Sequence, residues 1–367
     1  MKRHGDLWNK IIDKDNLLLA FKKAKRHKSW QQKVIKVEQN LEEMIEKLRE
    51  SLINGTYKTS GYRQKKIYEP KERTIYILPF YPDRIVHHAI MNILEPIWDK
   101  LFISHSYACR KNKGQHKGSI KCMEYVRKNR FCLKCDISKF YPSINHEILK
   151  RIIRKKIKCK RTIKLLDEII DSIDSPTNVP IGNYLSQWFG NLYLNELDMF
   201  LKHDCKIKYY LRYCDDFLLF SNDKQFLKDM SVKIEEFVTT KLKLKLSKCN
   251  ILSTSQGVDF LGYRHFSAGY ILVRKSTAKR MKKNIKALKY KLTVKKISKE
   301  SALSTVRLKN SKIEKGSTYA QIQIELHGEL RVIFTNSTVL KEQLQRYKEH
   351  LPFCTTIIKN NKYFSFS

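Results

Sequence analysis

Two neighbouring carboxylates, Asp215 and Asp216, stand between two apolar runs of the sequence. These runs, 207–213 and 217–221, are typical of two strands joined by a tight turn. Asp136 occupies a comparable place because it follows the apolar residues 131–135. Ionised carboxylates beside buried strands are costly unless protons, cations or metal ions neutralise them. If the strands share one sheet, the three side chains can converge at its edge, where hard oxygen ligands suit Mg²⁺ and phosphoryl transfer.

The three acids are not expected to play equal parts. Successive residues of a strand point to opposite faces, so we expect Asp136 and Asp215 to be the chief ligands and Asp216 to support them. An Asp-Asp turn can also form for backbone reasons alone. That alternative stays open on these residues by themselves.

The elements around the acids alternate between short strands and helices, which predicts an α+β fold. Residues 1–52 are predicted to be helical, 62–78 to form a hairpin, and a further helix to start at Pro82. We expect a strand over 131–137, a strand pair over 249–273, and helices over about 145–157, 162–174, 184–202 and 224–241. The last fifty residues predict hairpins around His327-Gly328 and Asn360-Asn361, with a helix near 338–350.

The chain is strongly basic. It has 74 Lys and Arg against 36 Asp and Glu, a formal charge of +38, so a polyanion such as nucleic acid is the expected partner. No run of 18 apolar residues and no signal peptide is found, so we expect a cytoplasmic protein with no membrane partner. The nine cysteines fit reduced thiols. Cys132 and Cys135 form a CxxC, but a buried strand is favoured over a zinc site because no second pair has the right spacing.

Positive charge gathers in residues 270–315, with sixteen Lys or Arg and two acids. Apolar residues recur there at helical spacing, so the segment predicts an amphipathic basic helix. A solvated surface helix is the alternative, but the imbalance favours contact with phosphates. The residues expected to meet the nucleic-acid backbone are Arg274, Lys275, Lys279, Arg280, Lys283 and Lys286.

Several motifs, in order, resemble the reverse transcriptase family over nearly residues 40–310. Tyr213-Cys214-Asp215-Asp216 is similar to the family's Tyr-x-Asp-Asp hairpin, and the segment 134–144 to the motif with the first catalytic aspartate. The resemblance implies a right-hand polymerase, with interleaved fingers and palm over 1–263 and a basic helical thumb over 264–316. Residues 317–367 would form a small appended β-rich module of unknown role.

The resemblance also implies roles for single residues. Asp136, Asp215 and Asp216 would be catalytic and, with Ile137, would bind two Mg²⁺ ions, for which Mn²⁺ could substitute. Tyr141 would be the steric gate that rejects a 2′-hydroxyl. The implied nucleotide-binding residues are Lys71, Arg73, Tyr141, Ile181, Gly182, Gln187 and Lys248, and the implied primer grip is Phe260, Leu261 and Gly262.

The stretch 179–187 indicates a subtype. Most of the family has Gln-Gly-x-x-x-Ser-Pro, whereas this chain has Ile181-Gly182-x-x-x-Ser186-Gln187, which resembles enzymes of diversity-generating retroelements. That group copies a structured template RNA into cDNA, misincorporates opposite template adenines, and works with a small basic accessory protein. Ile181 offers no amide donor, so looser checking of the base pair is expected. Gly182 would let the backbone approach the nucleotide closely.

Other readings stay open. A bacterial antiviral-defence reverse transcriptase that uses its own non-coding RNA is one, and a bacterial or phage-encoded origin fits both subtypes. A catalytically idle RNA-binding protein is another, and a scaffold for an acidic protein is a third. In the catalytic readings the partners are deoxynucleotide triphosphates, the template RNA and the RNA–cDNA duplex.

Overall fold

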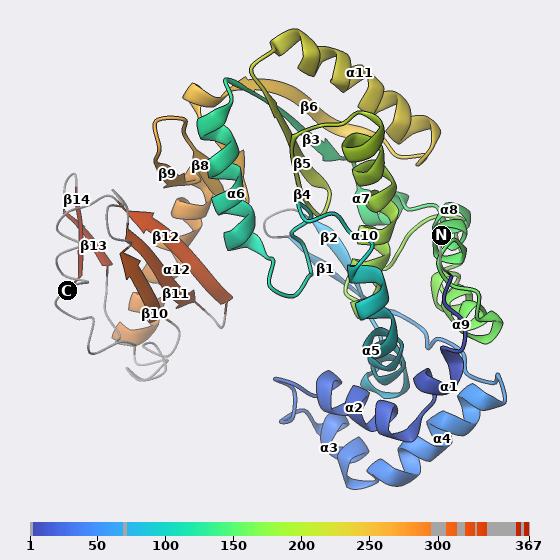
Figure 1. Ribbon diagram of the computed structural model, residues 1–367. Coiled ribbons are helices and arrows are strands. Elements are labelled where there is room, and N and C mark those ends of the chain that lie inside the picture. The colour runs from blue at the N-terminus through green and yellow to red at the C-terminus, as the bar shows by residue number, and fades with distance from the viewer. Residues whose placement is uncertain are drawn as a thin grey trace. The chain divides into compact units, whose positions relative to one another are not determined.

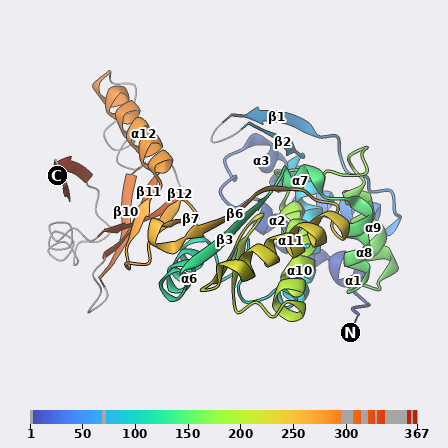
Figure 2. The same ribbon diagram turned by 90° about the horizontal axis from the view of Figure 1, so that it is seen from above.

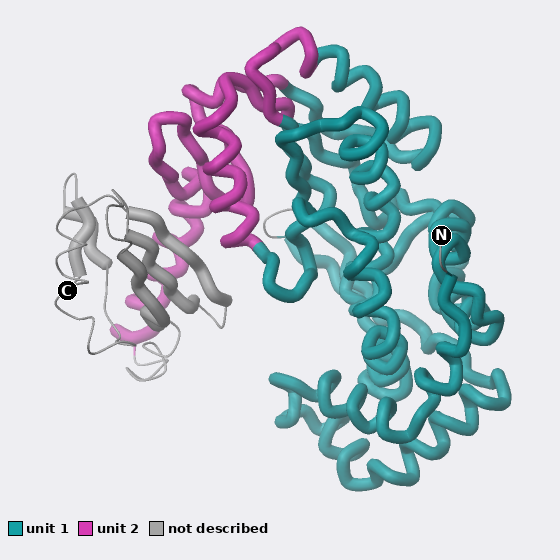
Figure 3. The backbone as a smooth tube through the Cα atoms, viewed as in Figure 1, with its two compact units in different colours: residues 1–114, 134–219, 228–250 teal, residues 115–133, 220–227, 251–367 magenta. Residues whose placement is uncertain are grey.

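The computed structural model describes residues 3–68, 72–294, 306–313, 320–326, 329–335, 357–360 and 363–366, the last five ranges by their backbone alone (Figure 1). The chain forms two compact units (Figure 3). The first comprises residues 1–114, 134–219 and 228–250, and the second comprises 115–133, 220–227 and 251–367. We describe each unit by itself.

A four-stranded sheet, in the order β4-β5-β3-β6, carries the predicted acids. Its strands are β3 (Phe131–Ile137), β4 (Tyr209–Tyr213), β5 (Asp216–Ser221) and β6 (Leu246–Ser253). The residues of β5 from Phe217 to Phe220 are all buried. A continuous apolar run is expected where both faces of a strand are covered. The predicted strand 131–137 and the predicted hairpin around Asp215 are confirmed.

Most of the first unit is helical. Its helices are α1 (Trp8–Ile11), α2 (Lys14–Ala24), α3 (Gln32–Gln39), α4 (Leu41–Ile53), α5 (Ile85–Asp99), α7 (Phe140–Ser143), α8 (His146–Arg154), α9 (Lys160–Ile170) and α10 (Tyr184–Met199). Helix α11 (Lys224–Thr240) belongs mainly to it, and two short π-helices, Phe80–Arg84 and Phe200–Asp204, complete the set. The predicted helical stretch 1–52 is therefore divided into four helices.

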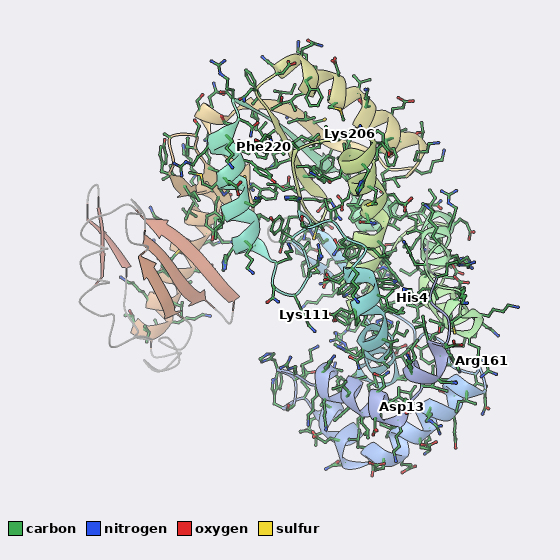
Figure 4. The ribbon with its side chains drawn as sticks, in the orientation of Figure 1. His4, Asp13, Lys111, Arg161, Lys206 and Phe220 are labelled. Carbon is green, nitrogen blue, oxygen red and sulfur yellow. The ribbon has the colours of Figure 1, made fainter. Side chains whose placement is uncertain are left out.

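Local chemistry explains the breaks near the N-terminus. The amide of Asn16 donates to Asp13 Oδ2 at 3.2 Å, so Asp13 caps α2 and separates it from α1 (Figure 4). The His4 amide donates to the Lys156 carbonyl at 2.7 Å, and the Lys158 amide donates to the His4 carbonyl at 2.8 Å. The chain ahead of α1 is thereby tied to the end of α8.

The predicted hairpin at 62–78 is confirmed as β1 (Arg63–Ile67) and β2 (Arg73–Ile77), which pair antiparallel with Arg63 opposite Ile77. Its side chains are exposed or half-buried, and the hairpin lies at the surface of the first unit (Figure 2). The predicted helices near 145–157, 162–174, 184–202 and 224–241 are confirmed as α8, α9, α10 and α11.

The second unit holds α6 (Gln115–Lys128), a 3-10 turn (Thr254–Gln256), β7 (Val258–Phe260), β8 (Tyr263–His265), β9 (Ile271–Val273) and α12 (Lys275–Thr293). It also holds β10 (Val306–Ile313), β11 (Ala320–Leu326), β12 (Glu329–Thr335), β13 (Ile357–Asn360) and β14 (Tyr363–Phe366). The prediction of two strands over 249–273 is wrong, because this stretch contains the end of β6 and the three short strands β7, β8 and β9.

The expectation that residues 264–316 are helical is wrong in its second half. Among the residues of this stretch that the structure describes, α12 is helical, and β10 pairs antiparallel with β11. The register of this pair shifts between Leu308 and Asn310. The strand was missed because this segment was judged by its basic composition. The hairpins β11–β12 and β13–β14 are confirmed, and the predicted helix near 338–350 lies outside the described residues.

Candidate active site

A two-residue turn joins β4 to β5 and carries Asp215. Cys214 has φ +53°, so it lies in the left-handed region that hairpin turns of this length require. A non-glycine residue pays about 1–2 kcal/mol for that conformation. The turn therefore needs support from its surroundings.

Asp216 is the first residue of β5 and forms an ion pair with Lys134 of β3, with 3.4 Å between Nζ and Oδ2. Its other oxygen, Oδ1, is buried and has no hydrogen-bond partner in the described part of the chain. Burial raises the pKa of Asp216 to about 6; Lys134 opposes the shift, and the negative charges of Asp136 and Asp215 add to it. The charges of Asp136 and Asp215 therefore affect the protonation of Asp216.

Asp136 is oriented by Ser247 of β6. The Ser247 hydroxyl lies 2.9 Å from Asp136 Oδ2 and 3.1 Å from the Asp136 carbonyl oxygen. Two residues later, just after the end of β3, the Ser138 amide donates to the Lys245 carbonyl at 2.8 Å. Sequence reasoning missed Ser247, although it precedes Lys248, which was singled out.

The strand positions of the acids bear on their expected ranking. Lys134 and Asp136 are two residues apart on β3 and share a face, and Asp216 pairs with Lys134, so Asp216 stands on that face too. Asp215 lies in the turn rather than in a strand. Strand alternation therefore does not turn Asp216 away from Asp136; the ranking of Asp136 and Asp215 as chief ligands, with Asp216 in support, stays a prediction.

The donor set fits a hard divalent cation. Among the described residues no three His, Cys, Asp or Glu side chains form a group that could hold a metal ion as they stand. A divalent cation, if bound, would give the unpartnered Oδ1 of Asp216 a partner and would offset the mutual repulsion of the carboxylates. Asp136, Asp215 and Asp216 are the residues that would hold it; the predicted part of Ile137, the last residue of β3, stays a prediction.

Tyr141 stands beside this site on α7. Burial raises the pKa of its hydroxyl, and electrostatic interactions with Cys214, Cys109 and Asp215 act in the same direction, because the ring lies near the turn. The ring also packs close to Gly190 of α10, where an added Cβ would lie 3.1 Å from Tyr141 Cε1. Glycine at 190 thus leaves the ring its space.

The loop before α10 is docked on the β1–β2 hairpin. The Tyr76 amide donates to the Ile181 carbonyl at 2.8 Å, and Gly182 has φ +117°. A Cβ on Gly182 would lie 2.8 Å from the Tyr76 carbonyl oxygen and 2.9 Å from Ile75 Cγ2. The close approach expected of Gly182 is therefore to β2, which accounts for this glycine without a nucleotide.

The other nucleotide-binding predictions are placed as follows. Arg73 is exposed on β2, Gln187 is exposed on α10, Ile181 is half-buried, and Lys248 is exposed on β6. Lys71 lies outside the described residues. The bond between the Tyr76 amide and the Ile181 carbonyl joins the loop before α10 to β2, the strand that begins at Arg73.

In the second unit, Phe260, Leu261 and Gly262 form the turn between β7 and β8. Leu261 and Gly262 have φ of +54° and +84°, the Arg274 amide donates to the Gly262 carbonyl at 3.0 Å, and Gln115 donates to the Leu261 carbonyl. None of the side chains of α12 is buried. Arg274 comes within 3.9 Å of Asp259, and no described acid pairs with the lysines of α12.

The described cysteines agree with the predictions of reduced thiols and of a buried strand at Cys132 and Cys135. Cys132 and Cys135 are buried in β3, and the described cysteines are thiols rather than disulfides. The Sγ atoms of Cys135 and Cys249 lie 3.0 Å apart. No described helix is long and apolar enough to cross a membrane.

Acidic residues that gather on a sheet, in a chain of charge +38, suit metal-dependent phosphoryl transfer on a nucleic acid. The family profile described as reverse transcriptase (RNA-dependent DNA polymerase) matches residues 63–265, which is more than half of the chain. The chain therefore belongs to the reverse transcriptase family. A second profile, described as a domain of unknown function, matches residues 283–367.

Two curated relatives are similar to this chain. Protein YkfC of Escherichia coli K12 is 26% identical over 277 residues, which is 59% of this chain and 70% of YkfC. The group II intron-encoded protein LtrA of Lactococcus lactis subsp. cremoris is 25% identical over 299 residues, which is 60% of this chain and 49% of LtrA. The chain thus spans about half the length of LtrA. Neither name points to a diversity-generating retroelement.

A solved structure is also similar. The apo telomerase of Candida tropicalis, truncated from its C-terminal domain, gives a TM-score of 0.45 at 16% identity, over 59% of this chain and 55% of that chain.

Proposed function

We propose that the protein is an RNA-directed DNA polymerase that copies a structured template RNA into cDNA. The observation that carries this proposal is the convergence of charge at Asp136, Asp215 and Asp216, where one buried carboxylate oxygen lacks a partner. Membership of the reverse transcriptase family supports the same reaction. The division into fingers, palm and thumb belongs to this proposal as well.

The chain's own residues would divide the work. Two Mg²⁺ ions, when bound, would stabilise charge on the attacking and leaving oxygens of the phosphoryl transfer. Ser247 orients Asp136, and Tyr141 borders the space for the sugar. Arg73 and Lys248 are exposed cations for the triphosphate. The basic side chains of α12 would contact the backbone of the RNA–cDNA duplex, whose A-form shape favours phosphate and 2′-hydroxyl contacts over base contacts.

Primer extension on an RNA template tests the proposal. Asp215→Asn should lose most of the rate, since a ligand to a reacting metal supplies much of the charge stabilisation. Asp174→Asn is the matched control, because Asp174 is exposed and makes no described hydrogen bond or ion pair. Equal synthesis by Asp215→Asn would refute the proposal. RNA binding without synthesis by the wild type would favour a catalytically idle RNA-binding protein.

We further propose error-prone copying at template adenines, as in diversity-generating retroelements, with a small basic accessory protein as partner. Ile181 supports this, because its backbone is fixed to Tyr76 while its half-buried side chain has no amide to check a base pair. Sequenced cDNA from an adenine-containing template should show errors concentrated there, and Ile181→Gln should reduce them. Equal error rates at all four template bases would remove this subtype.

A defence reverse transcriptase with its own non-coding RNA is the second candidate. Its motivation is an appended module, and residues 283–367, which match a domain of unknown function, extend beyond the reverse transcriptase match. Sequencing the RNA that copurifies with the protein, together with its cDNA, separates the candidates. One small RNA would indicate the defence type, and a repeat-flanked template with adenine errors would indicate the retroelement type.

A further inference from the structure

A buried arginine, Arg212, lies one residue before the turn motif and is not used by any role assigned so far. It belongs to β4 and is 0% exposed. Its Nε and Nη2 atoms donate to the two oxygens of Asp198 on α10, at 2.8 and 2.6 Å. Its Nη1 donates to Asn191 Oδ1 at 3.2 Å and to the Cys214 carbonyl at 3.0 Å. The guanidinium therefore joins helix α10 directly to the turn.

The same network is closed on its other sides. The Tyr210 hydroxyl donates to Asp198 Oδ1 at 2.6 Å, and Asn191 donates to the Ala108 carbonyl at 3.0 Å. The backbone of Arg212 is bonded at 3.0 Å to the His105 carbonyl and to the Tyr107 amide. Every bond runs within the first unit, so the position of Arg212 is fixed from the helix, from the strand and from the segment 105–107.

The turn has a specific need for this support. Cys214 is the residue with φ +53°, and its carbonyl is the one that Arg212 holds. Buried ion pairs add little net stability compared with apolar packing, so stability alone is a weak reason for a buried Arg212–Asp198 pair. A planar guanidinium fixes several acceptors at once, which a lysine cannot do.

We propose that Arg212 is a positioning residue that, through Asp198 and Asn191, sets the place of the turn carrying Asp215. The effect of Arg212 on catalysis rests on the proposed polymerase function, whereas its effect on the position of the turn does not. Loss of the bond to Cys214 would let the turn relax and would move the carboxylates relative to Asp136. A displacement of about 1 Å at such a site can cost on the order of a hundredfold in rate.

The test uses the full chain with Arg212→Lys, which keeps the charge and loses the planar fork. Arg154→Lys is the matched control, because Arg154 forms an Arg–Asp pair of 2.6 Å with Asp167 in the same unit, away from the turn. Amide hydrogen exchange over residues 213–217 is measured in magnesium-free buffer. We expect faster exchange in Arg212→Lys, by about tenfold, and no change in the control.

Kinetics supply the second readout. In Arg212→Lys we expect kcat for primer extension to fall about ten- to a hundredfold and half-saturation to need a higher Mg²⁺ concentration. The KM for deoxynucleotide should change little, because the loop before α10 is held by Tyr76 and not by Arg212. If Arg212→Lys fails to fold, Asn191→Ala decides, because it removes one bond to Arg212 without unbalancing charge. Wild-type exchange and Mg²⁺ response in the folded variant would overturn the proposal. A wild type without primer extension would instead refute the polymerase function, and hydrogen exchange alone would then test the positioning role of Arg212.

Discussion

Replacing Gly190 by alanine tests the assignment of Tyr141 as the sugar gate. Gly190 lies on the buried side of α10, directly behind two aromatic rings. A Cβ there would be 3.0 Å from Phe140 Cε1 and 3.1 Å from Tyr141 Cε1, so the rings must give by a few tenths of an ångström. Because α10 is fixed by its buried residues, the displacement of Tyr141 must be away from the helix, toward the space for the sugar.

The magnitude follows from two opposing terms. Overpacking costs about 1–3 kcal/mol, and alanine in place of glycine inside a helix returns about 1 kcal/mol. The net loss of unfolding free energy is therefore at most about 2 kcal/mol, and a folded variant is expected. The kinetic effect should be larger in KM than in kcat, because the ring narrows the nucleotide site and leaves the acids in place. We expect the KM for deoxynucleotides to rise about three- to tenfold.

Single-nucleotide incorporation kinetics with matched deoxy- and ribonucleotides provide the measurement. Gly190→Ala should keep or strengthen the rejection of ribonucleotides, whereas Tyr141→Ala should relax it. Thermal unfolding checks that both variants are folded. A folded Gly190→Ala with wild-type KM and wild-type sugar selection would show that Tyr141 does not border the nucleotide, and the gate assignment would fail.

Three further predictions follow from single contacts. Gly182→Ala should lower the unfolding free energy by about 1–3 kcal/mol, because its φ of +117° and the Tyr76 oxygen at 2.8 Å exclude a side chain; unchanged urea unfolding would contradict this. Ser247→Ala should reduce kcat several-fold with little loss of stability, and Ser247→Thr should restore it, since only the hydroxyl that orients Asp136 is at stake. Burial lowers the pKa of His87 from 6.5 to about 3, so the unfolded chain binds this proton more readily. The contribution of His87 to the free energy of unfolding should be complete above pH 6.5 and be lost as the pH falls toward 3. His87→Leu should weaken this pH dependence in urea unfolding. An unaltered pH profile would show that His87 is not responsible.

The sequence predicted what local pattern controls. The run 131–137 and the pair of runs around Asp215 are apolar enough to specify buried strands, and β3, β4 and β5 are found there. The hairpin β11–β12 follows from the alternation on both sides of His327-Gly328. Arg73 and Ile181 were each singled out, but the docking of the loop before α10 on β2 depends on one backbone bond, between Tyr76 and Ile181, that no local pattern reveals.

Other features could not be predicted because they depend on three-dimensional neighbours. Arg212 reads as one more basic residue in a chain with 74 of them, and nothing local shows that Asp198 will meet it. Ser247 lies 111 positions from Asp136, so only the pairing of β3 with β6 reveals their contact. Strand β10 was missed because its lysines and arginine were weighed as charge, while the alternation of its apolar residues is broken by a register shift.

Helix α10 has a consequence for the tolerance of this chain to substitution. It contains Gly190 behind the tyrosine ring, Asn191 and Asp198 against Arg212, and the docked loop just ahead of it, and eleven of its sixteen residues are buried. A scan of all single substitutions should therefore find few neutral ones over 185–198, even at polar positions that touch no substrate. Strand β1, whose residues from Arg63 to Lys66 are exposed, should tolerate many more, so natural variation and engineering have more room there than in the helix that Arg212 joins to the turn.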